Sequence, residues 1–190
     1  PEKLSDLGLF RDLATLEPHG GIVPYKVATP LWSDGAHKRR WFSIADTQSK
    51  IHFSAYKPWS FPGGSAWVKH FELDVVEDGL DRRKRIETRI LYRTPWYWYG
   101  TTYRWNDAQT DATLVPPDGE SEELTIRDGA GLAKLVWSYP SRRECLSGHN
   151  SKSRGALGFY TAQLNRPIDY GDGTENQLEA LSRAGYLDRE

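Results

Sequence analysis

The sequence predicts a mainly β fold, an antiparallel sandwich or partly open barrel with a few short helices at the termini. Two segments in the middle of the chain alternate apolar and polar residues, and a turn signal separates them. Further β-type segments follow at short intervals and are joined by clusters rich in Pro and Gly. A chain of 190 residues can bury its own core, so we expect a single β-rich domain over residues 1–190.

The first predicted element is a short amphipathic helix in the segment LSDLGLFRDLATLEP, residues 4–18. Leu7, Phe10 and Leu13 recur at helical spacing, and Ser5 is a candidate N-cap. The proline that closes the segment ends the pattern, because proline does not continue a helix. We therefore expect a helix of a few turns at the N-terminal end.

Residues 20–64 are rich in Pro, Gly, Trp and Ser and show little periodicity. This composition predicts ordered loops with short strands near residues 22–26 and 51–54. Irregular segments of this length are usually functional or tightly packed. Asp34 and His37 are candidates for a proton-transfer pair or for ligands to an ion, and an ordinary surface loop is the alternative.

The clearest signal is a β-hairpin formed by residues 65–75 and 83–93. Both segments alternate in polarity, and the sequence EDGLD between them contains an Asp-Gly turn signal. Because successive side chains of a strand point to opposite faces, His70 shares one face with Glu72 and Asp74. The sequence thus predicts the hairpin and also its sidedness, that is, which side chains point to which face of the sheet.

The remaining elements are two more β-type segments and a closing helix. Residues 96–105 and 124–128 have strand composition and are flanked by Pro and Gly turns. The final segment TENQLEALSRAGYL begins with a Thr174 to Gln177 capping box and reaches a C-cap glycine at Gly185. These signals predict additional strands followed by a short C-terminal helix.

Aromatic residues are abundant, with eight Trp, ten Tyr and six Phe. Such side chains fill cores, and they also stack on sugar rings and porphyrins. In the segment WYWYGTTYRW alternation sends every second side chain to the same side, so one set can face outward. An aromatic surface formed by residues such as Trp96, Trp98, Tyr103 and Trp105 would bind polysaccharide, and core packing is the alternative.

The segment RRECLSGHN holds the only cysteine of the chain, Cys145, four residues before His149. This is the spacing of the CxxCH attachment signature for c-type haem, with Gly148 in the place of the second cysteine. In such a site the histidine is an axial ligand of the haem iron. His149 is therefore a candidate iron ligand and Cys145 a candidate for one thioether, whereas Gly148 cannot form the other.

The sequence leaves other interpretations of these cysteine and histidine residues open. Cys145 and His149 can be a small buried hydrophobe and a loop or core histidine. A structural zinc site would need about four ligands, and the other histidines are widely separated. His70 is either a satisfied polar group within its strand or a second axial ligand to haem iron.

Composition and motifs give no support to several classes of function. The 25 Lys and Arg nearly balance the 26 Asp and Glu, which does not favour a nucleic-acid partner. The sequence contains no GxGxxG, Walker, HExxH or GxSxG motif, so nucleotide, protease and hydrolase functions have no motif in support. No apolar run approaches the length of about 20 residues that a transmembrane helix needs, so we expect no membrane span.

A series of short phrases in a fixed order resembles a family of exported bacterial proteins described as diheme c-type cytochromes, often encoded beside parallel β-helix repeat proteins. The resemblance runs from about residue 4 to residue 187. The phrases are LSDLGLF, GIVPYKVATPLWSDGAHKRRW, WSFPGGSAWVKHFEL, RIETRILYR, TTYRWNDAQTDATL, WSYPSRRECLSGHN and LGFYTAQLN.

The resemblance implies haem c as cofactor, with Cys145 as the first attachment cysteine, His149 as the proximal ligand and Gly148 in the place of the second cysteine. It also implies a periplasmic or secreted location and a longer protein of which this chain is the N-terminal part. Haem is absent if the glycine has abolished the site. The expected partner is an unidentified redox protein.

Three hypotheses about function follow. The first is a haem-containing electron-transfer or redox accessory domain that uses Cys145 and His149. The second is a carbohydrate-binding module of a secreted polysaccharide-degrading system. The third is an enzyme that uses Asp34, His37 or His70 with an ion.

Overall fold

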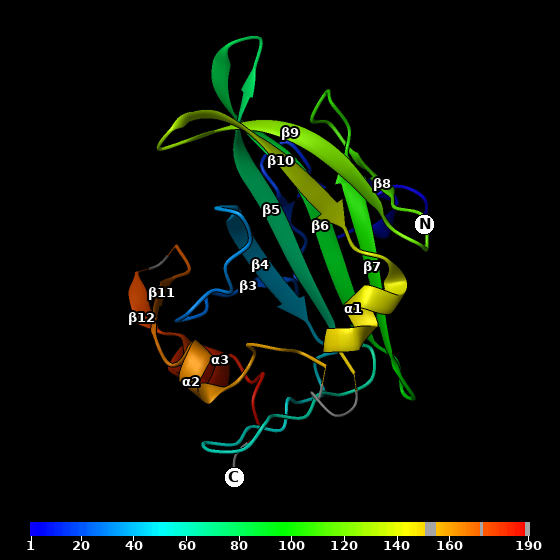
Figure 1. The fold of residues 1–190 in the computed structure, drawn as a ribbon. Helices are drawn as coiled ribbons and strands as arrows, with labels where there is room; N and C mark the ends of the chain where they lie inside the picture. Colours follow the sequence, from blue (N-terminus) through cyan, green and yellow to red (C-terminus); the bar gives the residue numbers. More distant parts are fainter. Residues whose placement is uncertain (151–154, 172, 189–190) are drawn as a thin grey trace.

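The computed structural model describes residues 1–150, 155–171 and 173–188, and it confirms the mainly β, antiparallel prediction (Figure 1). Six consecutive strands form one sheet in the order of the chain. Among the described residues its two outer strands do not pair with each other, so the sheet is open and not closed into a barrel. The strands are β3 (Val23–Pro24), β4 (His37–Ser43), β5 (Ala66–Glu77), β6 (Leu80–Arg93), β7 (Trp98–Trp105) and β8 (Ala112–Leu114).

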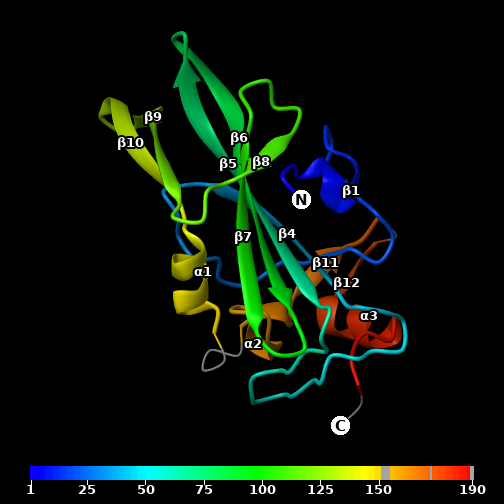
Figure 2. The same cartoon turned by 90° about the vertical axis from the view of Figure 1, so that its right-hand side faces the viewer.

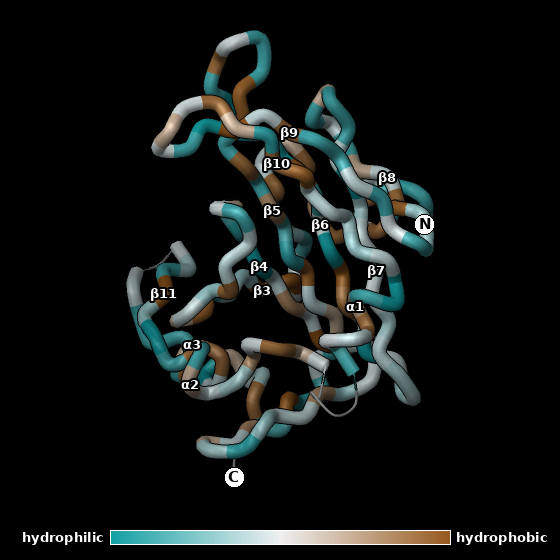
Figure 3. The backbone as a smooth tube through the Cα atoms, in the orientation of Figure 1, coloured by the Kyte–Doolittle hydropathy of each residue, from teal (hydrophilic) through white to brown (hydrophobic). Residues whose placement is uncertain are grey.

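The predicted central hairpin is confirmed as β5 and β6, which pair from Ala66↔Tyr92 to Glu77↔Leu80. Asp78 and Gly79 form its turn with φ of 51° and 78°, as a two-residue turn with two positive φ angles requires. Figure 3 shows hydrophobic and hydrophilic residues alternating along β5, the pattern from which the strand was predicted.

Both faces of the large sheet are covered. The face that carries Trp67, Lys69 and Phe71 is called the α1 face here, after the helix that lies on it. The opposite face carries Val68 and His70 and packs against the N-terminal segment (Figure 2). Successive side chains of these strands therefore point alternately toward two covered faces, and not alternately toward a core and toward solvent.

The predicted N-terminal helix is wrong. The segment forms a single 3-10 turn at Ser5–Leu7 and two short paired strands, β1 (Phe10–Asp12) and β2 (Glu17–Pro18). Phe10 instead packs edge-on against Trp41 of the sheet, with ring centroids 5.1 Å apart. Burial of Phe10 against the sheet outweighs the weak helical propensity of this segment, because a short helix is only marginally stable by itself.

A second hairpin covers one end of the α1 face. It consists of β9 (Glu120–Asp128) and β10 (Gly131–Tyr139), so the strand predicted at 124–128 is confirmed and is longer than expected. Phe71 and Trp137 meet across the two layers, with ring centroids 5.8 Å apart. This hairpin and the sheet enclose a distinct apolar cluster with Leu73, Val75 and Leu124.

The C-terminal part wraps the other end of the same face. Its elements are α1 (Arg142–Gly148), α2 (Thr161–Leu164), β11 (Pro167–Asp169), β12 (Thr174–Asn176) and α3 (Gln177–Arg183). The predicted C-terminal helix is confirmed as α3, but its N-cap is Asn176, which accepts from the Leu178 amide at 2.9 Å. None of the described helices is long and apolar enough to cross a bilayer.

Phe159 is the centre of the largest core. Its ring meets those of Tyr25 and Phe42 at 4.9 Å and that of Trp59 at 5.6 Å, all edge to face. The short strand expected near residues 22–26 is β3, whereas the one expected near 51–54 is reduced to single bridges at Ile51 and His52. The core thus joins three distant parts of the chain.

Candidate functional site

Helix α1 carries the cysteine and histidine motif and lies against β7 (Figure 1). Its first turn is fixed by a capping box, in which the Glu144 amide donates to Ser141 Oγ at 3.1 Å and the Ser141 amide donates to the Glu144 carboxylate at 2.8 Å. This helix is absent from the predicted elements, although the Ser141-x-x-Glu144 spacing is its sequence signal. The capping box sets the position of the whole motif.

Cys145 points from α1 toward the sheet. A Cβ added to Gly100 of β7 would lie 2.8 Å from the Cys145 Cβ and 3.5 Å from its Sγ, so the absence of a side chain at Gly100 permits this approach. Burial raises the pKa of the Cys145 thiol, and the nearby Arg89 and Thr102 oppose that effect only in part. The thiol is consequently protonated at neutral pH and a weak nucleophile.

His149 lies one turn after Cys145, at the C-cap of α1. Its Nδ1 donates to the Gly155 carbonyl at 2.6 Å, which places the ring proton on Nδ1 and leaves the lone pair on Nε2. Burial lowers the pKa of the imidazole, and the positive charges of Lys69 and Arg89 add to the effect. At neutral pH the side chain is therefore the neutral imidazole that metals bind.

Gly155 holds that acceptor in place. It has a φ of 76°, and a Cβ at this position would lie 1.9 Å from Cε2 of Trp98. Only glycine allows the backbone to lie this close to the indole and to adopt this conformation at low cost. The ring of Trp98 thus fixes the carbonyl that orients His149.

The histidine and the aromatic segment meet at one pocket of about 440 Å³. This volume lies in the range that small-molecule sites occupy in proteins. The principal residues that line the pocket are Trp59, Phe61, Arg93, Trp96, Trp98 and His149. Within this lining the Arg93 guanidinium lies 5.5 Å from the centroid of the Trp98 ring.

The structure divides the predicted aromatic surface. Trp96 and Trp98 line the pocket, and Trp96 is 87% exposed, whereas Trp98 is buried in the core cluster that contains Phe159 and does not form an outward surface. The prediction that Tyr103 and Trp105 join an outward surface is wrong, because both are buried in the core against the N-terminal segment. Alternation along β7 placed them on one face, and the N-terminal segment covers that face.

Gly148 is the last residue of α1 and has space around it. Among the described residues, the only heavy atom within 4 Å of a Cβ added there is Leu157 Cδ1, at 3.7 Å, and the φ of Gly148 lies outside the left-handed region. The first side-chain atom of a cysteine would therefore meet the described residues at an ordinary van der Waals distance. The local backbone is thus compatible with the residue that the attachment signature requires.

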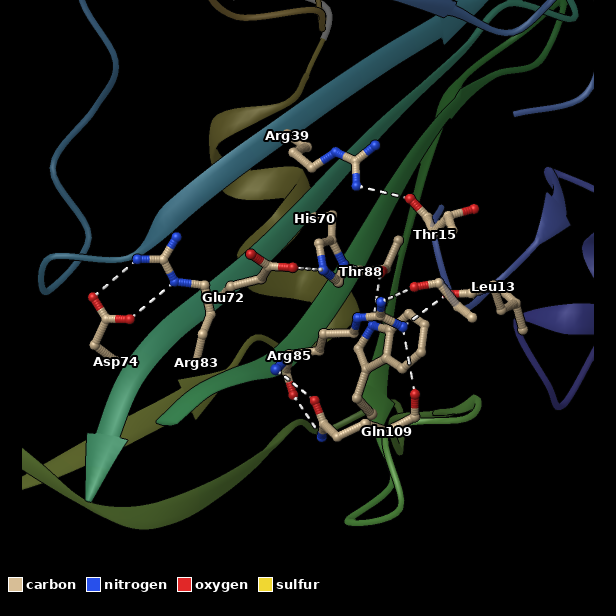
Figure 4. Close-up of polar contacts among 12 residues, drawn as sticks. Leu13, Thr15, Arg39, His70, Glu72, Asp74, Arg83, Arg85, Thr88 and Gln109 are labelled. Carbon is tan, nitrogen blue, oxygen red and sulfur yellow. Dashed lines mark hydrogen bonds and ion pairs between the residues drawn. The ribbon is translucent and has the colours of Figure 1, made fainter. Parts of the chain in front are cut away.

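The structure does not bring His70 together with His149. His70 is fully buried on the opposite face of the sheet, where its Nδ1 lies 2.9 Å from the Thr88 hydroxyl and its Nε2 lies 3.4 Å from Glu72 Oε1 (Figure 4). Its ring also meets the Trp105 indole edge to face at 5.4 Å. These contacts make it part of a buried polar network within the core.

Protonation of His70 should make folding pH-dependent. Burial lowers the pKa of His70 in the folded protein, so the unfolded chain takes up a proton first as the pH falls. We expect the free energy of unfolding to fall from about pH 7 to about pH 5, by at most about 1.4 kcal/mol per pH unit for one proton. The charged groups that act on the imidazole are Glu72, Arg85 and Arg39.

Urea unfolding at several pH values measures this slope. The pKa of His149 is lowered as well, so the variant His70→Gln should retain part of the slope and lose part of it. An unchanged slope in that variant would contradict the assignment. Stability that rises on acidification over the same interval would contradict it too.

Asp34 and His37 are part of an exposed surface. His37 Nε2 lies 3.0 Å from Asp74 Oδ2 and 2.9 Å from Arg83 Nη2, so its partners come from β5 and β6. Asp34 has a φ of 47° in the turn before β4. In the part of the chain that the structure describes, no group of three or more His, Cys, Asp or Glu side chains is arranged to hold a metal ion.

The residues of the site fit one half of a c-type haem site. His149 lines an aromatic pocket with its Nε2 lone pair available, as axial ligation requires. The thiol of Cys145 packs against β7 and Gly148 carries none, so two thioether bonds do not fit. Comparisons with protein-family models, curated proteins and solved structures give no match.

Proposed function

We propose that this protein is a cytochrome-like redox domain that holds haem through His149. The observation that carries the proposal is the meeting of an oriented, neutral imidazole with an aromatic pocket. The resemblance of the sequence to exported diheme c-type cytochromes supports the same cofactor, a periplasmic or secreted location and a redox protein as partner. Haem bound there would supply one-electron transfer.

The residues of the chain would have separate tasks. The Gly155 carbonyl holds the His149 proton on Nδ1, and the indole of Trp98 keeps that carbonyl in place. The aromatic walls would provide flat apolar surfaces for a macrocycle. Cys145 lies one helical turn from His149, and its side chain would have to turn away from Gly100 to form a thioether.

Titration of the purified protein with ferric haem tests this proposal. The protein should develop a Soret band with a low-spin or high-spin histidine signature, and His149→Ala should weaken haem binding by roughly tenfold or more. The control is His37→Ala, which removes an exposed histidine outside the pocket, whose partners Asp74 and Arg83 lie on β5 and β6. Equal titrations of the parent protein and His149→Ala would refute axial ligation.

A second candidate function has its own observation. Trp96 and Tyr97 are 87% and 59% exposed at the mouth of the pocket, beside Arg93. Exposed aromatic rings of this kind stack on sugar rings. We propose polysaccharide binding as the alternative function of the same region.

Affinity electrophoresis in gels that contain soluble polysaccharides tests the alternative. A polysaccharide that retards the parent protein should no longer retard Trp96→Ala, because its stacking surface is lost. Trp32→Ala is the matched control, since Trp32 is 77% exposed and lies outside the lining of the pocket. Retardation that both substitutions leave unchanged would exclude this surface.

A further inference from the structure

Three cationic side chains stand next to one another on the α1 face. Arg40 of β4 is directly opposite Lys69 of β5, and Lys69 is directly opposite Arg89 of β6. Directly opposed residues of neighbouring strands share one face and lie close enough to interact. We call Arg40, Lys69 and Arg89 the cation row.

The cation row lies in a half-buried strip of the α1 face between two apolar clusters. On one side is the cluster of Phe71 and Trp137, and on the other is the aromatic core that contains Phe42 and Trp67. Arg40, Lys69 and Arg89 are partly exposed, so solvent reaches the strip.

Positive charge in this strip is poorly compensated. Glu87 is fully buried and pairs with Arg89 at 2.8 Å and 2.5 Å. In residues 1–150, 155–171 and 173–188, neither the Lys69 ammonium nor the Arg40 guanidinium has a hydrogen bond or ion pair, and Lys69 lies 4.8 Å from the Phe71 ring centroid. Burial and the charges of Arg40, Arg89 and Lys38 lower the pKa of Lys69 to about 7, and the charge of Glu87 opposes this effect only in part.

Two other cations of the same sheet, Lys84 and Arg83, have acidic partners. Lys84 Nζ lies 2.9 Å from Glu77 Oε1 and 3.8 Å from Glu122 Oε1, and Arg83 Nε lies 2.9 Å from Asp74 Oδ1. Like charges directly opposite one another destabilise a sheet. Three of them in a row are an arrangement that folding alone disfavours.

We propose that the cation row binds an oxyanion, a carboxylate or phosphate group of a ligand that enters the strip. Guanidinium groups match both kinds of oxyanion with paired hydrogen bonds, and the lysine adds a point charge between them. A bound anion would supply the missing compensation for Arg40 and Lys69. None of its residues is a proposed haem ligand, so anion binding can be measured in the absence of haem.

The test compares thermal unfolding of four proteins at pH 6, where Lys69 is charged. They are the parent protein, Arg40→Met, Lys69→Met and the control Lys134→Met, which removes a cation paired with Glu123 on the exposed hairpin. Bis-Tris chloride is the buffer, and sodium chloride keeps the ionic strength constant. The probes are inorganic phosphate and succinate.

Phosphate, succinate or both should raise the Tm of the parent protein and of Lys134→Met, by about 3–5 °C at an anion concentration tenfold above the Kd. The larger response identifies the preferred oxyanion. Arg40→Met and Lys69→Met should lose most of this increase. Titration calorimetry on the parent protein should show saturable binding, at least about tenfold weaker in either variant.

Two results would overturn the proposal. One is a Tm that neither anion raises beyond sodium chloride in the parent protein. The other is an equal increase in all four proteins, which would mean general stabilisation by the salt. Both are independent of haem titration, so failure of this site and failure of the proposed function remain distinguishable.

Discussion

Gly148→Cys should convert the site to one that retains haem covalently. Gly148 ends α1, and Leu157 Cδ1, at 3.7 Å, is the only heavy atom of the described residues within 4 Å of a Cβ added there. With Cys145 it restores the spacing that two thioether bonds require. We expect most of the haem to stay with the polypeptide after acid-acetone extraction, whereas the parent protein should release most or all of it.

The variant is to be expressed in a host with haem-attachment machinery, and covalent haem is measured by absorbance and by the mass of the intact chain. Ser147→Cys is the matched control, because it adds one thiol on the exposed side of α1 at the wrong spacing. Covalent haem in both variants would mean that any added thiol reacts. No haem in Gly148→Cys would show that this fold does not hold the cofactor.

Phe159→Ala should cause the largest loss of stability. Phe159 is 1% exposed and meets five other aromatic rings, among them Tyr25, Phe42 and Trp67, with centroids 4.9–5.9 Å apart. Removing the ring loses its burial and leaves a cavity that edge-to-face neighbours cannot fill. We expect the free energy of unfolding to fall by about 3–5 kcal/mol.

Urea unfolding followed by tryptophan fluorescence and circular dichroism measures this loss. Leu157→Ala is the control, because Leu157 is 54% exposed and its truncation should cost less than about 1 kcal/mol. A loss below about 1 kcal/mol in Phe159→Ala would mean that the C-terminal part does not stabilise the sheet.

Some elements could be predicted because their signals are local. Asp78 and Gly79 supply the two positive φ angles of the β5–β6 turn, and alternation on both sides of the turn extends the hairpin. Helix α3 was predicted from its apolar spacing and from Gly185, which has a φ of 80° just after the helix. In these places local propensity and tertiary structure favour the same conformation.

Other predictions failed where contacts between distant residues decide the structure. The N-terminal apolar residues fit a helix by spacing, but Phe10 is buried against the sheet from a short strand and Leu16 is buried from the turn that follows it. The same distinction between local signals and distant contacts applies to the residues of the candidate site. Cys145 and His149 could be singled out by spacing, whereas Arg93 and Gly155 could not, since the packing of Trp98 brings them there.

The sequence alone determined the central β5–β6 hairpin, the sidedness of its residues and the spacing of the Cys145 and His149 motif, because each depends on residues only a few positions apart. The tertiary structure alone decided which cover each face receives. It buried His70 beneath the N-terminal segment, placed His149 at the aromatic pocket and left Arg40, Lys69 and Arg89 in a half-buried row. A two-residue period assigns side chains to faces, whereas the packing of distant segments decides what each face meets.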